Sequence, residues 1–148
     1  MKTIYGKILS IKETRTSDNL EGFLVETTTH TIKVLISNEQ KCCESWGYVS
    51  SEDDLNYFIG SNLYEIAYCS EVENLLETTV VAIEPNVSSF EKGQDMLIEV
   101  LFLNFTTNKG VFQLTVYNEQ NGYYSHDVLI EVVENATGNT VIRSDDAL

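Results

Sequence analysis

The chain has 148 residues, of which 43% are hydrophobic, and a formal net charge of −14 from 23 acidic and 9 basic side chains. This length suits one ordinary globular core, and no stretch approaches the roughly 20 apolar residues that a membrane helix needs. Because phosphate-binding surfaces need clustered Lys and Arg, this composition argues against direct binding to nucleic acid. The acidic surface can meet a basic partner protein, and the alternative is that the charge only keeps the protein soluble.

Alternation of apolar and polar residues predicts strands over residues 3–14, 23–28 and 31–37, separated by turn residues. Ser51 is a natural N-cap, and the acidic residues Glu52, Asp53 and Asp54 that follow suit the positive end of a helix dipole. The sequence therefore predicts one short helix over about residues 51–59, ended by Gly60. Another strand is expected over residues 63–69.

The second half reads as strands over residues 78–84, 96–105, 111–117 and 123–133. Residues 71–74 are the expected hinge between the halves, and Pro85 ends the first of these strands. Asn121-Gly122 is a type I′ turn signal. Residues 135–148 are polar or weakly apolar, which predicts a flexible tail.

An internal repeat relates the two halves of the chain. The tripeptide Asn-Glu-Gln at residues 38–40 returns at residues 118–120, and flanking residues match at the same spacing. Residues 3–70 and 78–134 are therefore interpreted as two diverged copies of one β-unit. We expect a single domain over residues 1–148 with a β-rich α+β fold, in which two pseudo-symmetric four-stranded units pack together.

Hydrolytic catalysis finds little support in the sequence. The chain has two histidines, and His30 lies in a polar turn where a solvated side chain is expected. His126 stands between Ser125 and Asp127, but consecutive strand residues point to opposite faces and cannot converge as a triad. No glycine-rich phosphate loop is present. We therefore expect a protein that is not an enzyme.

Metal binding is a further hypothesis, since Cys42, Cys43, Cys69 and His126 are ligand types that suit Zn²⁺. The usual Cys-x₂-Cys spacing is absent, so the alternative is one buried and one half-exposed thiol in the Cys-Cys pair. An odd number of cysteines fits a reducing compartment, and the N-terminus lacks a signal-peptide core, which together indicate the cytoplasm.

Aromatic residues flank the two matched turns of the repeat, and aromatic side chains near loop ends are good interface anchors. The candidate partner-binding residues are Trp46, Tyr48, Tyr123 and Tyr124, together with Glu52, Asp53 and Asp54. The alternative is that the aromatic residues close a sheet face and the acidic ones are a solvated edge.

Two strings resemble a family of small uncharacterised proteins from bacteriophages and mobile elements. They are Cys-Cys-Glu-Ser-Trp-Gly at residues 42–47 and Val-Tyr-Asn-Glu-Gln-Asn-Gly-Tyr-Tyr-Ser-His-Asp-Val at residues 116–128. The chain is also similar to the acidic phage inhibitors of type II-A CRISPR systems, which target Cas9. This resemblance implies a non-enzymatic inhibitor that binds Cas9 with its guide RNA in the host cytoplasm and blocks target DNA binding. The alternatives are a zinc-stabilised interaction module with another host partner, or an anti-defence protein that binds a small ligand.

Overall fold

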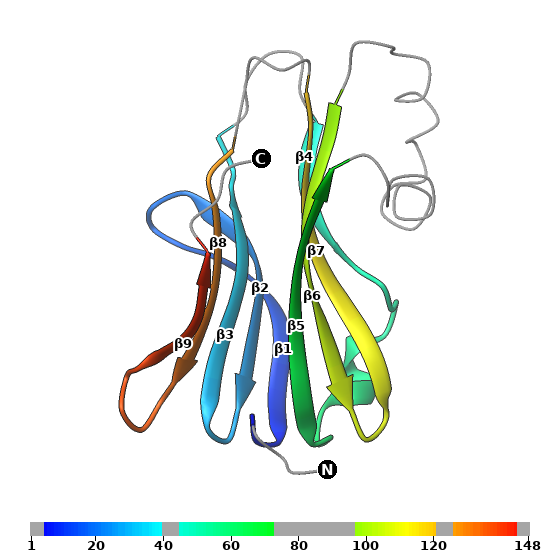
Figure 1. The fold of residues 1–148 in the computed structure, drawn as a ribbon, viewed down its shortest axis with the longest axis vertical. Coiled ribbons are helices and arrows are strands. Elements are labelled where there is room, and N and C mark those ends of the chain that lie inside the picture. The colour runs from blue at the N-terminus through cyan, green and yellow to red at the C-terminus, as the bar shows by residue number, and fades with distance from the viewer. Residues whose placement is uncertain (1–4, 40–44, 73–96, 121–125, 145–148) are drawn as a thin grey trace.

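The computed structural model describes residues 5–39, 45–72, 97–120 and 126–144, which form two antiparallel β-sheets packed face to face (Figure 1). The first sheet has the strand order β1-β2-β3-β8-β9, and the second has the order β4-β7-β6-β5. The strands of the first sheet are β1 (Ile8–Arg15), β2 (Leu20–Thr27), β3 (His30–Ser37), β8 (Val128–Glu134) and β9 (Thr140–Ser144). Those of the second are β4 (Ser45–Ser50), β5 (Leu63–Val72), β6 (Leu97–Thr107) and β7 (Gly110–Gln120).

The predicted β-rich fold is confirmed, but the helix expected over about residues 51–59 is only a 3₁₀ turn, η1 (Leu55–Phe58). Ser51 does not cap it. The Ser51 N–H donates to the Gln113 carbonyl at 2.9 Å, and its hydroxyl accepts from the Gln113 N–H at 2.8 Å. These bonds continue the β4–β7 ladder by one residue, so the helix cannot begin there. Asp54 caps η1 instead, accepting from the Asn56 N–H at 3.0 Å.

Each four-stranded unit exchanges its last strand with the other. The β4 strand follows β3 in sequence but pairs with β7, whereas β8 follows β7 but pairs with β3. The first sheet therefore contains β1, β2 and β3 with β8, and the second contains β5, β6 and β7 with β4. Because each sheet takes a strand from the other half, the two halves share one core.

The repeat is visible in the hydrogen bonds of the two equivalent hairpins. Thr27 and Thr107 end β2 and β6, and both are buried. The Thr27 hydroxyl accepts from the Thr29 N–H at 3.2 Å, and the Thr107 hydroxyl accepts from the Lys109 N–H at 3.0 Å. Residues 78–84, which the sequence places at the start of the second copy, lie outside the described residues. The β5 strand falls at the end of the predicted first copy, residues 3–70, but it pairs with β6 in the second sheet, where its position corresponds to that of β1 in the first.

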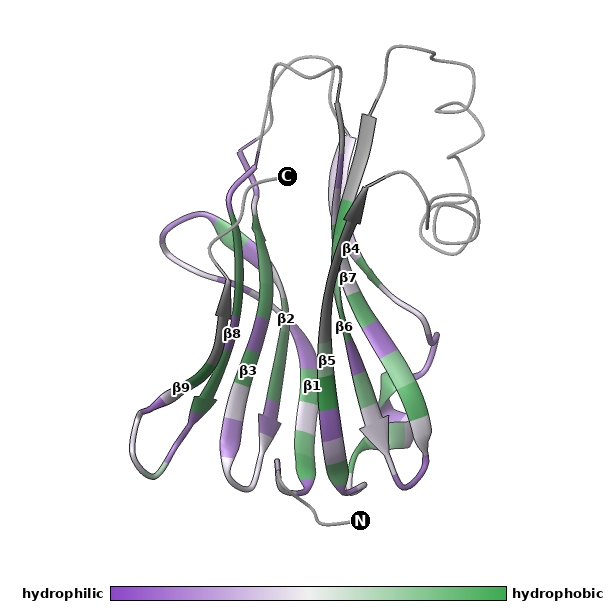
Figure 2. Cartoon of the chain, in the orientation of Figure 1, coloured by the Kyte–Doolittle hydropathy of each residue, from purple (hydrophilic) through white to green (hydrophobic). Residues whose placement is uncertain are grey.

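The apolar faces of both sheets meet in one core. Hydrophobic (green) and hydrophilic (purple) residues alternate along several strands in Figure 2. Phe105 and Phe112 stack with ring centroids 4.7 Å apart and an interplanar angle of 3°. The ring of Phe58 lies 4.7 Å from that of Phe112. Phe58 therefore anchors η1 in the core, although this turn is only 4 residues long.

The two sheets also meet along one side, where the start of β1 runs beside the start of β5. The Ile8 N–H donates to the Ser61 carbonyl at 2.9 Å, and the Gly60 N–H donates to the Ile8 carbonyl at 2.8 Å. A bridge between Lys7 and Asn62 continues this pairing. At another corner, β4 approaches the start of β8, where the Trp46 and His126 rings lie 5.4 Å apart.

The residues after Asn135, which the sequence predicts to be a flexible tail, contain a turn and a strand. The Asn135 side chain accepts from the Thr31 hydroxyl at 2.7 Å, and the Gly138 N–H donates to the Glu134 carbonyl at 2.8 Å. The chain then pairs with β8 as β9. A β-branched run, Thr-Val-Ile at residues 140–142, suits this edge position. Residues 145–148 lie outside the described part of the chain.

Candidate functional site

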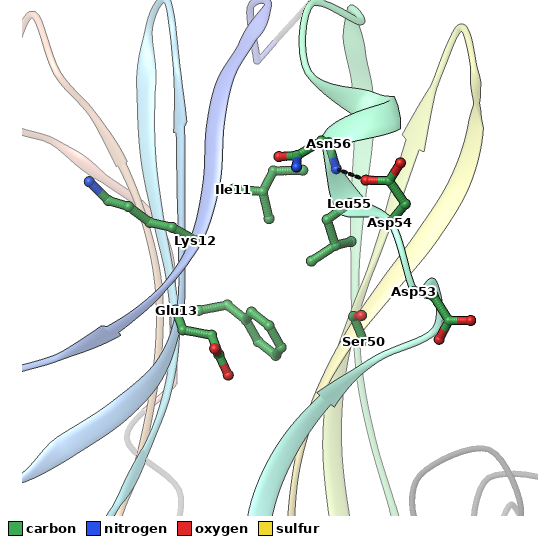
Figure 3. A pocket seen from close by; sticks show the side chains of 9 residues that line it. Ile11, Lys12, Glu13, Ser50, Asp53, Asp54, Leu55 and Asn56 are labelled. Atoms are coloured by element: carbon green, nitrogen blue, oxygen red, sulfur yellow. Dashed lines mark hydrogen bonds between the residues drawn. The ribbon is translucent and has the colours of Figure 1, made fainter.

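An open pocket of about 390 Å³ lies between β1 and the segment that joins β4 to η1 (Figure 3). Its lining combines apolar, acidic and neutral polar residues from both sheets: Ile11, Lys12, Glu13, Phe23, Ser50, Asp53, Asp54, Leu55 and Asn56. We call this site the β1 pocket. The volume is near the lower end of the range that is usual for ligand sites.

The centre of the β1 pocket is apolar. Ile11 and Leu55 point toward one another across the gap in Figure 3, and Ile11 and Phe23 are both buried. Lys12 points away from the gap in the same view. Asp53 and Asp54 extend from the far side of their segment, so they form an outer acidic rim and not the pocket floor. An apolar group can therefore enter the pocket, while charged groups meet its rim.

Tyr48 on β4 does not line the pocket but packs against Phe23, which does. Its ring packs edge to face against Phe23, with centroids 5.3 Å apart and an interplanar angle of 86°. Burial raises the pKa of Tyr48, and the nearby carboxylates of Glu13 and Glu21 raise it further. Arg15 opposes that effect and forms an ion pair with Glu21 at 2.8 Å. Burial is the largest cause of the raised pKa, and the smaller contributions of Glu13 and Glu21 reflect two carboxylates close to the Tyr48 hydroxyl.

The pairing of β1 with β2 explains why these groups gather. Glu13 stands opposite Phe23, and Arg15 stands opposite Glu21. The β4 strand passes over this pair with Tyr48 inward, and η1 then supplies Leu55 from the other side. Two strands of the first sheet and one connection of the second are therefore needed to build the site.

Of the predicted partner-binding residues, Asp53 and Asp54 line the β1 pocket, and Tyr48 packs beside it on Phe23. Glu52 is exposed in the same segment but does not line the pocket. Trp46 is half-buried against the core near His126 and so lies apart from them. Tyr123 and Tyr124 fall outside the described residues.

Most residues of the site were not predicted from sequence, among them Ile11, Glu13 and Phe23. Each is an ordinary member of an alternating strand, with no local signal that marks it as functional. The Glu13–Phe23 pairing that places them together follows from the strand register, which appears only in the folded chain.

The predicted zinc ligands are not assembled in the described part of the chain. Cys42 and Cys43 lie outside it, and Cys69 is described only by its backbone pairing with Phe102. His126 is 1% exposed, with Nδ1 2.6 Å from the Ser37 carbonyl oxygen. Among the described residues, no group of three or more His, Cys, Asp or Glu side chains is arranged to hold a metal ion.

The second histidine differs from its prediction. His30 was expected to be solvated in a polar turn, but it is only 5% exposed, so that expectation is wrong. Its Nδ1 lies 2.7 Å from the Thr29 hydroxyl oxygen, and its ring packs edge to face against Tyr5 at 5.1 Å. The chain before β1 covers this hairpin, which the local sequence around His30 does not reveal.

None of the helical segments found among the described residues is long and apolar enough to cross a membrane. Comparison with curated proteins finds no match, and comparison with solved structures likewise finds none. A family model described as a domain of unknown function, DUF7448, matches residues 2–130. This match contains the whole β1 pocket and ends before β9. Because it covers most of the sequence, the chain belongs to the DUF7448 family.

Proposed function

We propose that this protein is a phage-encoded, non-enzymatic inhibitor that binds a basic nucleic-acid-binding protein in the host cytoplasm. The first candidate partner is Cas9 with its guide RNA, whose target DNA binding the inhibitor blocks. The observation that supports this most is the β1 pocket itself. It places the apolar residues Ile11 and Leu55 beside the carboxylates of Glu13, Asp53 and Asp54, with Tyr48 packed next to it on Phe23.

The proposed mechanism is occupancy of a basic surface. Cas9 holds its guide and target in positively charged channels. A compact chain with a net charge of −14 is drawn to such a channel, and exposed carboxylates mainly increase the association rate. Aromatic side chains that become desolvated then supply most of the binding energy. Competition for the surface blocks DNA, so no bond-making step is required.

The test compares two double charge reversals that change the net charge equally. The first is Glu52→Lys with Asp53→Lys, which leaves the Asp54 cap of η1 intact. The matched control is Glu65→Lys with Asp127→Lys, since both of these residues are exposed on other parts of the sheets. Association with Cas9–guide RNA and binding of target DNA are measured at low and high salt.

We expect the first variant to associate roughly tenfold more slowly at low salt, and the control to stay near the unchanged protein. The difference should shrink at high salt, because exposed charges are screened. Equal losses in both variants would show that only net charge matters and would remove the pocket rim as the contact. No inhibition by the unchanged protein at large molar excess would remove Cas9 as the partner.

The two other hypotheses have separate measurements. A zinc-stabilised module predicts about one zinc per chain by metal analysis and a lower melting temperature with chelator. A small-ligand protein predicts a saturable thermal shift in a ligand screen. Nucleotides are the weaker candidates for the β1 pocket, because its acidic groups repel phosphate and its one lysine, Lys12, points away.

A further inference from the structure

The β1 strand is at the end of the first sheet, and the chain itself pairs with only the first part of its outer edge. Ile8 exchanges hydrogen bonds with residues 60 and 61, as described above. The chain reaches this pairing from η1 through Gly60, where φ is +87°, and the residues of η1 itself are not paired with β1. Beyond Ile8, no described strand pairs with this edge of β1. An edge strand offers alternate N–H and C=O groups to an incoming strand.

The β1 pocket lies beside this edge. Three consecutive residues of β1 line it, Ile11, Lys12 and Glu13, and residues 53–56 line the opposite wall. Because these residues are consecutive, the pocket runs along the backbone of β1, where an extended ligand could pair with it. Because an extended peptide presents its side chains alternately to two faces, one face would meet the apolar centre and its backbone would meet β1.

We propose that the β1 pocket receives an extended, basic peptide segment of the partner, which adds to β1 as an antiparallel strand. The segment continues the pairing that residues 60–63 begin, and those residues already run antiparallel to the start of β1. Ile11 and Glu13 lie on the same face of β1, so the inward face of the segment places an apolar side chain beside Ile11 and Leu55 and a basic side chain beside Glu13. This inference rests on the proposed function, because that function supplies a basic partner.

Charge decides between a basic segment and the other possible occupant, a second copy of this chain. Two copies would each bring a net charge of −14, so their acidic rims would repel one another. The strand also carries features that discourage casual pairing, namely a register shift between Ile8 and Ser10 and the charged residues Lys12 and Arg15. Attraction between a basic segment and the acidic residues of the pocket can overcome these obstacles to pairing, whereas a second acidic copy gains no such attraction.

The experiment uses the full-length protein and synthetic peptides of about eight residues, a usual strand length, in which valine and arginine alternate along the inward face and threonine occupies the outward face. Two further versions have the same residues but carry N-methyl groups on one or the other set of alternate amides. These preserve charge and composition while blocking one backbone edge. Binding is measured by calorimetry, and hydrogen exchange is followed at each amide of β1 and of the other edge strand, β9.

We expect the unmodified peptide to bind and to slow exchange in β1 over residues 11–15. At least one N-methylated version should bind roughly tenfold more weakly, since it loses backbone hydrogen bonds. Glu13→Lys should weaken binding of the unmodified peptide, and Asp127→Lys should leave it unchanged.

Equal binding of all three peptides, or protection at β9 without β1, would overturn strand addition at this site. Strand addition would also be overturned if the peptide failed to bind while inhibition of Cas9 still depended on Glu52 and Asp53. In that case the proposed function would survive. Conversely, peptide binding that protects β1 in a protein that never affects Cas9 would keep the strand site and remove the proposed function.

Discussion

Truncation of Phe58 is the most direct test of how the β1 pocket is held in shape. Phe58 is 4% exposed, and its ring lies 4.7 Å from that of Phe112 in the core. Leu55, on the same 3₁₀ turn, forms a wall of the pocket. Since η1 is only 4 residues long, its own hydrogen bonds cannot fix its position, and the Phe58 contact must do so.

The expected cost of Phe58→Ala is about 3–5 kcal/mol, the usual loss when a buried phenylalanine is truncated. The Phe58–Phe112 ring contact accounts for about 0.5–1.5 kcal/mol of that loss. For a chain of this size the melting temperature should fall by roughly 6–20 °C. A domain with a stability of about 10 kcal/mol, the middle of the usual range, would remain folded after this loss.

The assay is urea unfolding at equilibrium, with Tyr57→Ala as the matched control. Tyr57 is the preceding residue and is 58% exposed, with its ring edge to face on Phe58 at 5.1 Å, so its truncation should cost about 0.5–1.5 kcal/mol, well below the cost of Phe58→Ala. An unchanged slope against denaturant would show that the loss is one of stability. A double-mutant cycle with Phe112→Leu then isolates the ring contact. Equal effects of the two alanine variants would refute the claim that Phe58 anchors η1.

Two further predictions concern the backbone of β2 and the charge around Tyr48. Gly22→Ala should lower the free energy of unfolding by more than about 3 kcal/mol, because an added Cβ would meet the Val34 carbonyl oxygen of β3. Gly138→Ala should lower it by only about 1–2 kcal/mol, the cost of a positive φ for alanine. Thermal unfolding of both variants checks this order. The pKa of Tyr48 is raised in the folded state, so the folded chain keeps this proton longer and stability falls as pH rises through 10.0, the ordinary tyrosine value. Tyr48→Phe should make that fall shallower in urea unfolding at several pH values, and an identical pH profile would contradict the assigned cause.

The repeat in the sequence predicts more of the fold than any single strand does. It identifies the β2–β3 and β6–β7 hairpins as equivalent, and Thr27 and Thr107 fulfil the same role in both. It cannot predict that β4 and β8 change places, because alternation assigns side chains to faces but does not name the neighbouring strand. That choice depends on contacts between residues far apart in sequence.

The helix prediction failed for a related reason. Ser51 followed by Glu52, Asp53 and Asp54 satisfies the local rules for a helix start. The hydrogen bonds of Ser51 to Gln113 belong to a sheet that joins the two halves, and they fix its backbone as a strand extension. Local capping is worth about 1 kcal/mol, which is less than the ladder and core contacts that position this segment.

The position of the pocket follows from a difference between the two halves, namely in the connection that comes after β4 and after β8. The exchanged strands β4 and β8 are equivalent, but β4 leads into η1 and β8 leads into β9. After β4, residues 53–56 pass opposite β1, and the β1 pocket lies between them. After β8, the chain turns back and adds β9 to the first sheet. One connection therefore creates a pocket beside an edge strand, and the other adds a strand. Because the family match at residues 2–130 includes the first connection and not β9, the β1 pocket is the part of this asymmetry that belongs to the family region.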